Sequence, residues 1–187
     1  MKEIVLHGRG GQGVVFAADL LVNAFVLEGK FGNAIPFFGF ERRGAPVAAF
    51  VRVDDRPIRE KTQIYHPDGV IVLDPTLART VDIFKGLRQN AIVVLNDPRR
   101  LDAISFPAQV RRAGAVNATH IALAVLQVPI PNSCMIGAFV KSTGWVSWQG
   151  VEESFRANFP PHLVEANLKA AREAYELTEV KDFRGEG

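Results

Sequence analysis

Six consecutive residues near the N-terminus have the composition of a turn that another group can approach closely. They are Gly8, Arg9, Gly10, Gly11, Gln12 and Gly13, and their glycines include the spacing G-x-G-x-x-G. Glycine tolerates positive φ and has no Cβ to block a ligand, and the N-terminus of a following helix presents unpaired N–H groups and a positive dipole end. This glycine turn therefore predicts a site for a phosphate or another anion, with Arg9 as a fixed charge beside it.

The motif alone leaves three interpretations of the glycine turn open. The turn could serve only to pack a strand tightly against a helix, it could bind an anion, or it could bind a nicotinamide or flavin dinucleotide. The dinucleotide is the least supported, because an acidic residue should follow about 20 residues later to hold the ribose. Glu28 comes too early for this role, and Glu41 lies beyond a Pro-Phe-Phe-Gly turn. The Gln12 side chain either reaches across a contact or only satisfies backbone groups of the turn.

A second unusual stretch, which we term the aromatic–basic segment, spans Pro36–Pro46. Its Gly and Pro residues predict a loop. Large apolar groups beside charges are typical of protein interfaces, where Arg also pairs with carboxylates or phosphates. We therefore expect interface contacts from Phe37, Phe38, Phe40 and Glu41, and inter-subunit or phosphate contacts from Arg42 and Arg43. In the alternative, the phenylalanines cap the domain's own sheet and the arginines are solvated.

The remaining candidate residues do not form a catalytic or metal-binding set. The single cysteine, Cys134, cannot hold an iron–sulfur cluster, which usually needs four thiolates, and the four histidines lack a paired metal spacing. His7 follows an apolar run and is expected to be a core or edge histidine rather than a base. Trp145 and Trp148 either anchor an interface or pack against the last helix. No catalytic residue and no metal site is predicted.

Apolar patterning predicts the elements that position these residues. Short apolar runs bounded by turn residues predict strands at 3–7, 47–53, 69–74 and 91–96, and helical spacing predicts helices at 14–28, 117–126, 133–141 and 162–177. Strands of this kind separated by helix-sized segments are typical of a parallel sheet buried on both faces. The predicted fold is α/β and Rossmann-like: a doubly wound, mostly parallel sheet with helices on both faces.

Size and composition limit the classes of function. We expect one domain at residues 1–177 and a charged C-terminal tail at 178–187 of the 187-residue chain. A net charge of +2 without a run of basic residues argues against nucleic acid as a partner. Apolar stretches are shorter than the roughly 20 residues of a membrane span, and no signal peptide is expected before the first strand. A cytoplasmic location is therefore expected.

Several blocks, taken in their order, resemble the gamma subunit of pyruvate and related 2-oxoacid:acceptor oxidoreductases. The resemblance extends from about residue 3 to about residue 177. Its most specific block is P-F-F-G-F-E-R-R-G-A-P-V at residues 36–47, which favours the pyruvate, 2-oxoisovalerate and phenylglyoxylate branches. The other blocks are G-R-G-G-Q-G-V at 8–14 and those at residues 54–59, 63–65, 71–77, 131–138 and 158–161.

The resemblance implies a function that depends on companion chains. Complexes of this family convert a 2-oxoacid and coenzyme A to acyl-CoA, CO2 and a reduced acceptor, which is ferredoxin or a flavoprotein. Thiamine diphosphate and Mg²⁺ are held by the alpha and beta subunits, and [4Fe-4S] clusters by the beta and delta-type subunits. The gamma subunit would bind no cofactor alone, pack beside the thiamine-binding chains and help to shape the approach of coenzyme A. A free-standing NAD- or FAD-binding oxidoreductase is the alternative.

Overall fold

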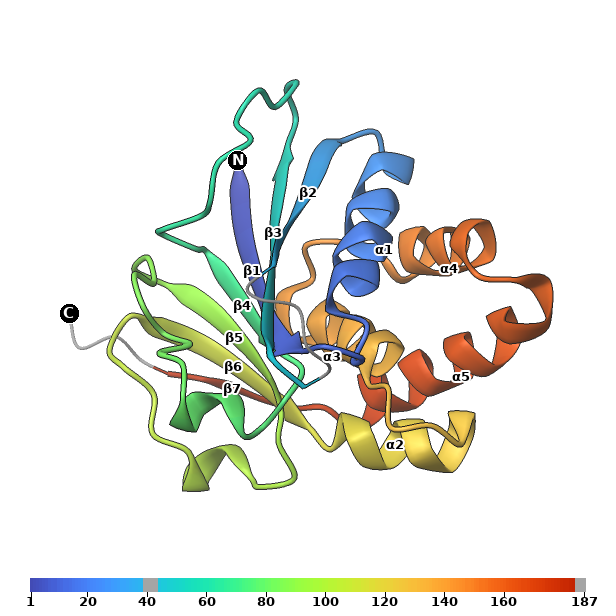
Figure 1. Cartoon of the computed structure of the whole chain (residues 1–187). Coiled ribbons are helices and arrows are strands. Elements are labelled where there is room, and N and C mark those ends of the chain that lie inside the picture. Colours follow the sequence, from blue (N-terminus) through green and yellow to red (C-terminus); the bar gives the residue numbers. More distant parts are fainter. Residues whose placement is uncertain (39–43, 184–187) are drawn as a thin grey trace.

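A central sheet organises the chain, whose computed structural model describes residues 1–38 and 44–183. Within these residues, seven strands form one sheet in the order β2-β3-β1-β4-β5-β6-β7, and five α-helices pack against it (Figure 1). The strands are β1 (Lys2–Arg9), β2 (Phe31–Phe38), β3 (Pro46–Asp54), β4 (Gly69–Val72), β5 (Ala91–Asn96), β6 (Val110–Val116) and β7 (Glu179–Asp182). The helices are α1 (Val14–Leu27), α2 (Ala118–Leu126), α3 (Asn132–Thr143), α4 (Trp148–Asn158) and α5 (Pro161–Leu177). Single 3₁₀ turns are η1 (Leu77–Arg79) and η2 (Leu101–Ala103).

The sheet is mixed, which confirms the α/β class, and five of the seven described strands, β1, β2, β4, β5 and β6, run in the same direction. The neighbours β1, β4, β5 and β6 run parallel, whereas β2 pairs antiparallel with β3, β3 with β1, and β7 with β6. For β2 and β3 the cause is the length of their connection. Only seven residues join β2 to β3, and a parallel pairing requires a crossover of a dozen or more.

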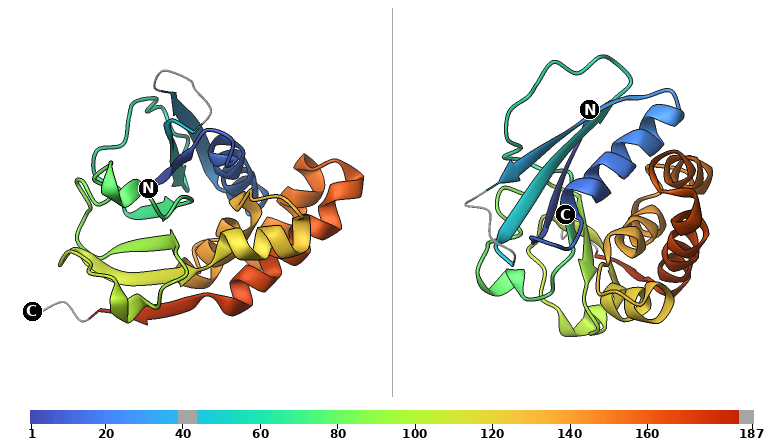
Figure 2. Two further views of the ribbon diagram at one scale, coloured as in Figure 1. Left: turned by 60° about the horizontal axis from the view of Figure 1, so that its bottom comes forward. Right: turned by 45° about the vertical axis from the view of Figure 1, so that its right-hand side comes forward.

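All five α-helices described lie on one face of the sheet (Figures 1 and 2). Alternation along β1 directs Ile4 and Leu6 into the core beneath these helices, which also contains residues of α1, α3 and α5. Helix α3 lies in the middle and is buried along nearly its whole length. This face is where most of the apolar core of the protein lies.

The opposite face is covered by connecting segments, so the expected helices on both faces are not found there. Two smaller cores lie under these segments, one around Val70 and Val93 and the other formed by Val5, Phe50 and Ile64. The connections after β4 and β5 begin at Asp74-Pro75 and Asp97-Pro98, and the only helical turns within them are η1 and η2. Proline and an adjacent Asp favour turns, which explains why no longer helix forms at these positions.

The strands and helices expected from patterning are present within a few residues, and the structure adds four more elements: β2, β6, α4 and β7. Strand β7 lies at the start of the segment expected to be a charged tail. Its residues pair with β6, and the ring of Phe183 packs 5.1 Å from that of Phe106. Among the helices of the described ranges, none has the length and apolar character needed to cross a bilayer.

Candidate functional site

The glycine turn connects β1 to α1 and adopts a backbone that requires glycine. Gly13 has φ +74° and immediately precedes α1, and Gly11 has φ +95°. A Cβ on Gly13 would lie 2.5 Å from Nδ2 of Asn132, and one on Gly8 would lie 2.4 Å from a methyl carbon of Val14. Tight packing between strand, helix and α3 thus accounts for two of the glycines, whereas Gly11 faces open space.

Gln12 braces the turn from within. Its Oε1 accepts the backbone N–H of Arg9 at 2.8 Å, and its Nε2 donates to the Asp74 carboxylate at 2.6 Å. Asp74 follows the end of β4, which is the parallel neighbour of β1. The side chain of Gln12 therefore ties the carboxyl ends of these two strands together.

Arg9 also takes part in this brace, and its positive charge lies opposite the negative charge of Asp74. Its guanidinium donates to Thr76 Oγ1 at 3.0 Å and to the carbonyl of Gly44 at 3.1 Å, and its Nε lies 3.5 Å from Asp74 Oδ1. Burial by itself raises the pKa of Asp74, but hydrogen bonds from Thr76 and Gln12 and the charge of Arg9 outweigh it, so the pKa is lowered. Asp74 is thus an ionised partner of the turn.

A hollow of about 520 Å³ opens beside the N-terminus of α1. Gly10, Gly11 and Gly13 line it together with Arg9 and Asn132, and the rest of the lining is apolar: Val14, Val15, Phe16, Val47 and Ile130. No side chain caps α1 and its first turn contains no acidic residue, so the free N–H groups and the positive dipole end of the helix are available to an anion. The arrangement can hold one phosphate-sized group, which keeps the anion interpretation of the glycine turn as a hypothesis.

The same geometry disfavours a dinucleotide. In a dinucleotide-binding fold the strand after the first helix lies parallel to the first strand and ends in the ribose-binding acid. Here α1 leads into β2, which forms an antiparallel hairpin with β3, and β3 is the antiparallel neighbour of β1. The one acid at the end of a parallel neighbour, Asp74, already bonds to Gln12 and Thr76.

The aromatic–basic segment is only partly a loop. Residues 36–38 belong to β2 and Pro46 begins β3, which corrects the loop expectation at both ends. The Phe37 side chain is 50% exposed, and its ring packs 5.9 Å from that of Phe50. The expected contact residues Phe40, Glu41, Arg42 and Arg43 lie outside the described residues.

The glycine turn and the aromatic–basic segment meet at their backbones. The N–H of Gly10 donates to the carbonyl of Ala45 at 2.9 Å, and the N–H of Gly44 donates to the carbonyl of Gly10 at 3.3 Å. Sequence reasoning missed this contact, as it missed Asp74 and Thr76. The signal available for these two was the Asp74-Pro75 turn directly after an apolar strand.

The remaining candidate residues lie apart from the glycine turn or have side chains that are uncharged at neutral pH. Burial lowers the pKa of His7 to about 4, and burial raises the pKa of the Cys134 thiol to about 12. Trp145 packs edge-on against Phe139, and Trp148 against Tyr175 of α5. Within residues 1–38 and 44–183, no group of three or more His, Cys, Asp and Glu side chains could hold a metal ion.

Comparisons with known proteins give a consistent result over the whole chain. The family model described as pyruvate ferredoxin/flavodoxin oxidoreductase matches residues 3–177. The chain is 49% identical over 182 residues to the pyruvate/ketoisovalerate oxidoreductases common subunit gamma of Pyrococcus furiosus, covering 96% of this chain and 98% of that one. It is 42% identical over 176 residues to the gamma subunit of NADH-dependent phenylglyoxylate dehydrogenase of Aromatoleum evansii, covering 94% and 93%.

A solved structure shares the fold. The pyruvate oxidoreductase subunit PORC of Thermotoga maritima superposes with a TM-score of 0.84 at 33% identity, covering 97% of this chain and 98% of that one. The family match, the near-complete coverage of these relatives and the common fold together show that this chain belongs to the pyruvate ferredoxin/flavodoxin oxidoreductase family, as one of its gamma subunits.

Proposed function

We propose that this chain is the non-redox gamma subunit of a thiamine-diphosphate-dependent complex that converts a 2-oxoacid and coenzyme A to acyl-CoA and CO2 and reduces an acceptor. Its relatives are named for pyruvate, ketoisovalerate and phenylglyoxylate, which favours a 2-oxoacid of this kind. Ferredoxin or a flavoprotein is the proposed acceptor. The alpha, beta and delta-type chains would carry thiamine diphosphate, Mg²⁺ and the iron–sulfur clusters, and thiamine diphosphate would supply the decarboxylation chemistry.

In this proposal the glycine turn contacts a phosphate of coenzyme A at the boundary with the thiamine-binding chains. The observation that carries it is the hollow at the start of α1, which has uncapped N–H groups and Arg9 among its lining residues. A phosphate group fits the donors present, because backbone N–H groups at a helix N-terminus and a guanidinium are the usual ligands of phosphate. This chain's own role is to bind and orient, since no acid–base pair faces the hollow among its lining residues.

Replacing Arg9 with Gln in the assembled complex tests this role. One charge-assisted hydrogen bond contributes about 1.5–3 kcal/mol, so the KM for coenzyme A should rise about tenfold or more. The KM for the 2-oxoacid and the kcat should change little, because both depend on groups of other chains. Steady-state kinetics with pyruvate and varied coenzyme A gives these values.

Arg79→Gln is the matched control, because Arg79 is an exposed arginine on η1 that does not line the hollow. This control should keep the KM for coenzyme A of the unchanged complex. An Arg9→Gln complex that is fully assembled and has the original KM for coenzyme A would contradict the proposed phosphate contact. Thermal melting of both variants shows whether a raised KM comes with a loss of stability, as expected if the brace between Arg9 and Asp74 is lost.

A further inference from the structure

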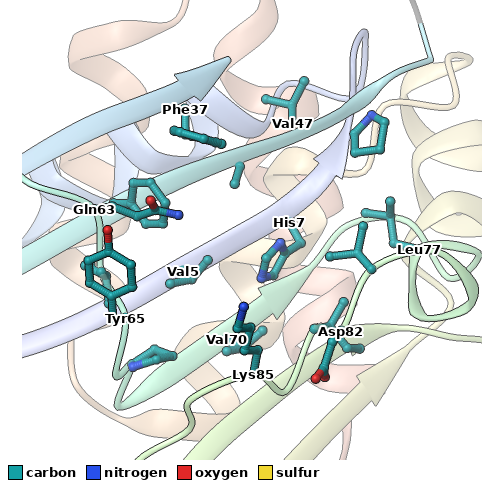
Figure 3. A pocket seen from close by; sticks show the side chains of 17 residues that line it. Val5, His7, Phe37, Val47, Gln63, Tyr65, Val70, Leu77, Asp82 and Lys85 are labelled. Carbon is teal, nitrogen blue, oxygen red and sulfur yellow. The ribbon is translucent and has the colours of Figure 1, made fainter. Parts of the chain in front are cut away.

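A second cavity, of about 370 Å³, lies on the sheet face opposite the α-helices (Figure 3). The strand register shows how its floor is built. One row of side chains crosses the sheet as Phe37, Ala48 and His7, and the next row crosses it as Phe50, Val5 and Val70. The volume is within the range of about 300–1000 Å³ typical of small-molecule sites.

Two connecting segments form the walls of the cavity. Residues 63–67 contribute Ile64 and the exposed ring of Tyr65, and the chain after β4 contributes Leu77 and Ile83. Ile64 belongs to one core of this face, and Leu77 and Ile83 belong to the other. The cavity therefore lies between two apolar cores whose side chains do not meet at this point.

Ala48 explains why the floor is open at its middle. Its methyl group stands in the row between the larger side chains of Phe37 and His7, on the central stretch of the floor. A longer side chain at this position would extend into the cavity. Ala48 is therefore the position at which a substitution fills the site with the smallest disturbance of its walls.

An ion network that is buried at Glu3 and Arg52 and exposed at Arg88 keeps the wall at residues 63–67 from collapsing onto the floor. Arg52, which is 3% exposed, donates to Glu3 at 2.8 Å and to the carbonyl of Thr62 at 2.7 Å. Arg88 donates to Glu3 at 2.6 Å and to the carbonyl of His66 at 2.7 Å. Both guanidinium groups thus fix the backbone of this wall, and the cavity is preformed.

The interior of the cavity favours an uncharged guest. Apolar and aromatic side chains make up most of the lining, and Figure 3 shows His7 among them on the floor, with Asp82 and Lys85 at one edge. Burial lowers the pKa of His7 to about 4, so its imidazole is neutral at neutral pH and can donate or accept one hydrogen bond. On the floor beside His7 a charged group would lose its hydration, because the only charged side chains of the lining, Asp82 and Lys85, stand at the edge of the cavity.

We propose that this cavity binds a small uncharged molecule made of an aromatic ring or a branched aliphatic group, with one hydrogen-bonding group directed at His7. The rings of Phe37, Phe50 and Tyr65 suit an aromatic guest, since aromatic pairs prefer edge-on and offset contacts of the kind that these walls offer. This site is separate from the glycine turn, and none of the residues that line the hollow at α1 except Val47 also lines this cavity.

The probe for this proposal is p-cresol, a neutral ring with one hydroxyl, compared with 4-methylbenzoate, an ionised ring of similar shape. Titration of the full chain, followed by the methyl carbon spectra of Val5, Val70 and Ile83, should show saturable shifts with p-cresol at millimolar concentration. Val151, in the core on the helix face, should not respond. Binding of 4-methylbenzoate should be at least tenfold weaker.

Three variants localise the binding. Ala48→Leu should weaken p-cresol at least tenfold, whereas Ala157→Leu, the same change at an exposed position of α4, should not. His7→Phe keeps a ring but loses the hydrogen bond, and should weaken p-cresol about fivefold. Equal binding of the charged and neutral probes, absence of shifts at the cavity methyl groups, or undiminished binding to Ala48→Leu would each overturn the proposal.

A companion subunit could instead insert an apolar side chain into the cavity, and the assembled complex distinguishes this case. Saturation-transfer spectra of p-cresol with the complex should show binding, and the same complex built with Ala48→Leu should not. If the free gamma chain binds p-cresol but the assembled complex does not, a companion subunit occupies the cavity. That result would also overturn the proposal.

Discussion

His7 and Cys134 show how burial sets the chemistry of single side chains in this protein. The same cause lowers the pKa of one to about 4 and raises the pKa of the other to about 12, so both are uncharged at neutral pH. His7 lies on the cavity floor, and Cys134 lies inside α3. The expectation that His7 is a core or edge histidine agrees with this burial, and a buried neutral thiol is a poor nucleophile.

The lowered pKa of His7 predicts a specific dependence of stability on pH. Between pH 6.5 and about 4 the unfolded chain binds a proton that the folded chain excludes, so the free energy of unfolding falls as the pH drops through this window. The full effect is about 3 kcal/mol. Urea unfolding at pH 7 and pH 4 should show a smaller decrease for His7→Phe than for the unchanged chain, by about this amount.

His162→Phe is the control for this measurement, because His162 is exposed at the start of α5. Its decrease between pH 7 and pH 4 should match that of the unchanged chain. A direct titration of the His7 ring by NMR checks the cause. If the ring titrates near pH 6.5, burial does not control its protonation.

Arg42 and Arg43 carry the interface prediction of the aromatic–basic segment. Replacing both with Ala should loosen assembly of the complex or raise its requirement for coenzyme A, because guanidinium groups pair with carboxylates and phosphates. Melting of the isolated chain should be almost unchanged. Co-purification and differential scanning calorimetry give the two readouts.

Arg99 and Arg100 form another adjacent pair, and Ala at both positions is the matched control. This control removes the ion pair of Arg99 with the buried carboxylate of Asp97 and that of Arg100 with Glu179, but it should leave assembly intact. If Arg42→Ala and Arg43→Ala together unfold the isolated chain, these residues are structural and the interface assignment is wrong.

At the scale of elements, α3 and α5 pack closely against each other in the core. Gly137 makes this packing possible, because a Cβ at this position would lie 1.9 Å from the carbonyl oxygen of Ala171. This atom belongs to the backbone of α5, so it cannot move aside as a side chain can. The glycine also accounts for the burial of both faces of α3, which lies between the sheet and α5.

Gly137→Ala should therefore destabilise the chain, although alanine is the better helix former by about 1 kcal/mol. Overpacking costs about 1–3 kcal/mol, and a clash with backbone lies at the upper end of this range, so after the gain in helix propensity we expect a net loss of about 1–2 kcal/mol in denaturant unfolding. Lys141→Ala, at an exposed position of the same helix, should be close to neutral. An alanine variant as stable as the unchanged chain would contradict the close approach of α3 and α5.

The elements also show which signals in the sequence are reliable. Strands β4 and β5 were predicted because almost every residue is apolar and buried, and α5 because it combines strong amphipathicity with an initial proline. Strand β2 was missed because Pro36 indicates a loop, yet an edge strand tolerates proline where its N–H would face solvent. Strand β7 was missed because its polar residues, Glu179, Lys181 and Asp182, have no strand pattern of their own.

For the whole molecule, the sequence predicted the α/β class and the place of the glycine turn, since both depend on local patterns. It could not predict the mixed sheet or the helices on one face, because these depend on which strands pair across long distances. The same holds for the brace of the turn: Gln12 and Asp74 lie 62 positions apart. The family resemblance added the gamma-subunit assignment, and the comparisons confirm it.

Truncation tests how far the folded molecule extends. A chain ending at Leu177 loses β7 and the packing of Phe183 on Phe106, which should lower the free energy of unfolding by about 3 kcal/mol and expose the edge of β6. A chain ending at Phe183 should unfold as the full chain does, as measured in denaturant. If the shorter chain keeps full stability, the domain boundary expected at residue 177 is correct.

The backbone bonds of Gly10 with Gly44 and Ala45 have a mechanical consequence. Gly44 and Ala45 are bound directly to the backbone of the glycine turn. A ligand that displaces the glycine turn would therefore also displace Gly44 and Ala45. A neighbouring chain that displaces Gly44 and Ala45 would change the conformation of the turn. Two regions whose roles were inferred separately from the sequence are thus joined through their backbones.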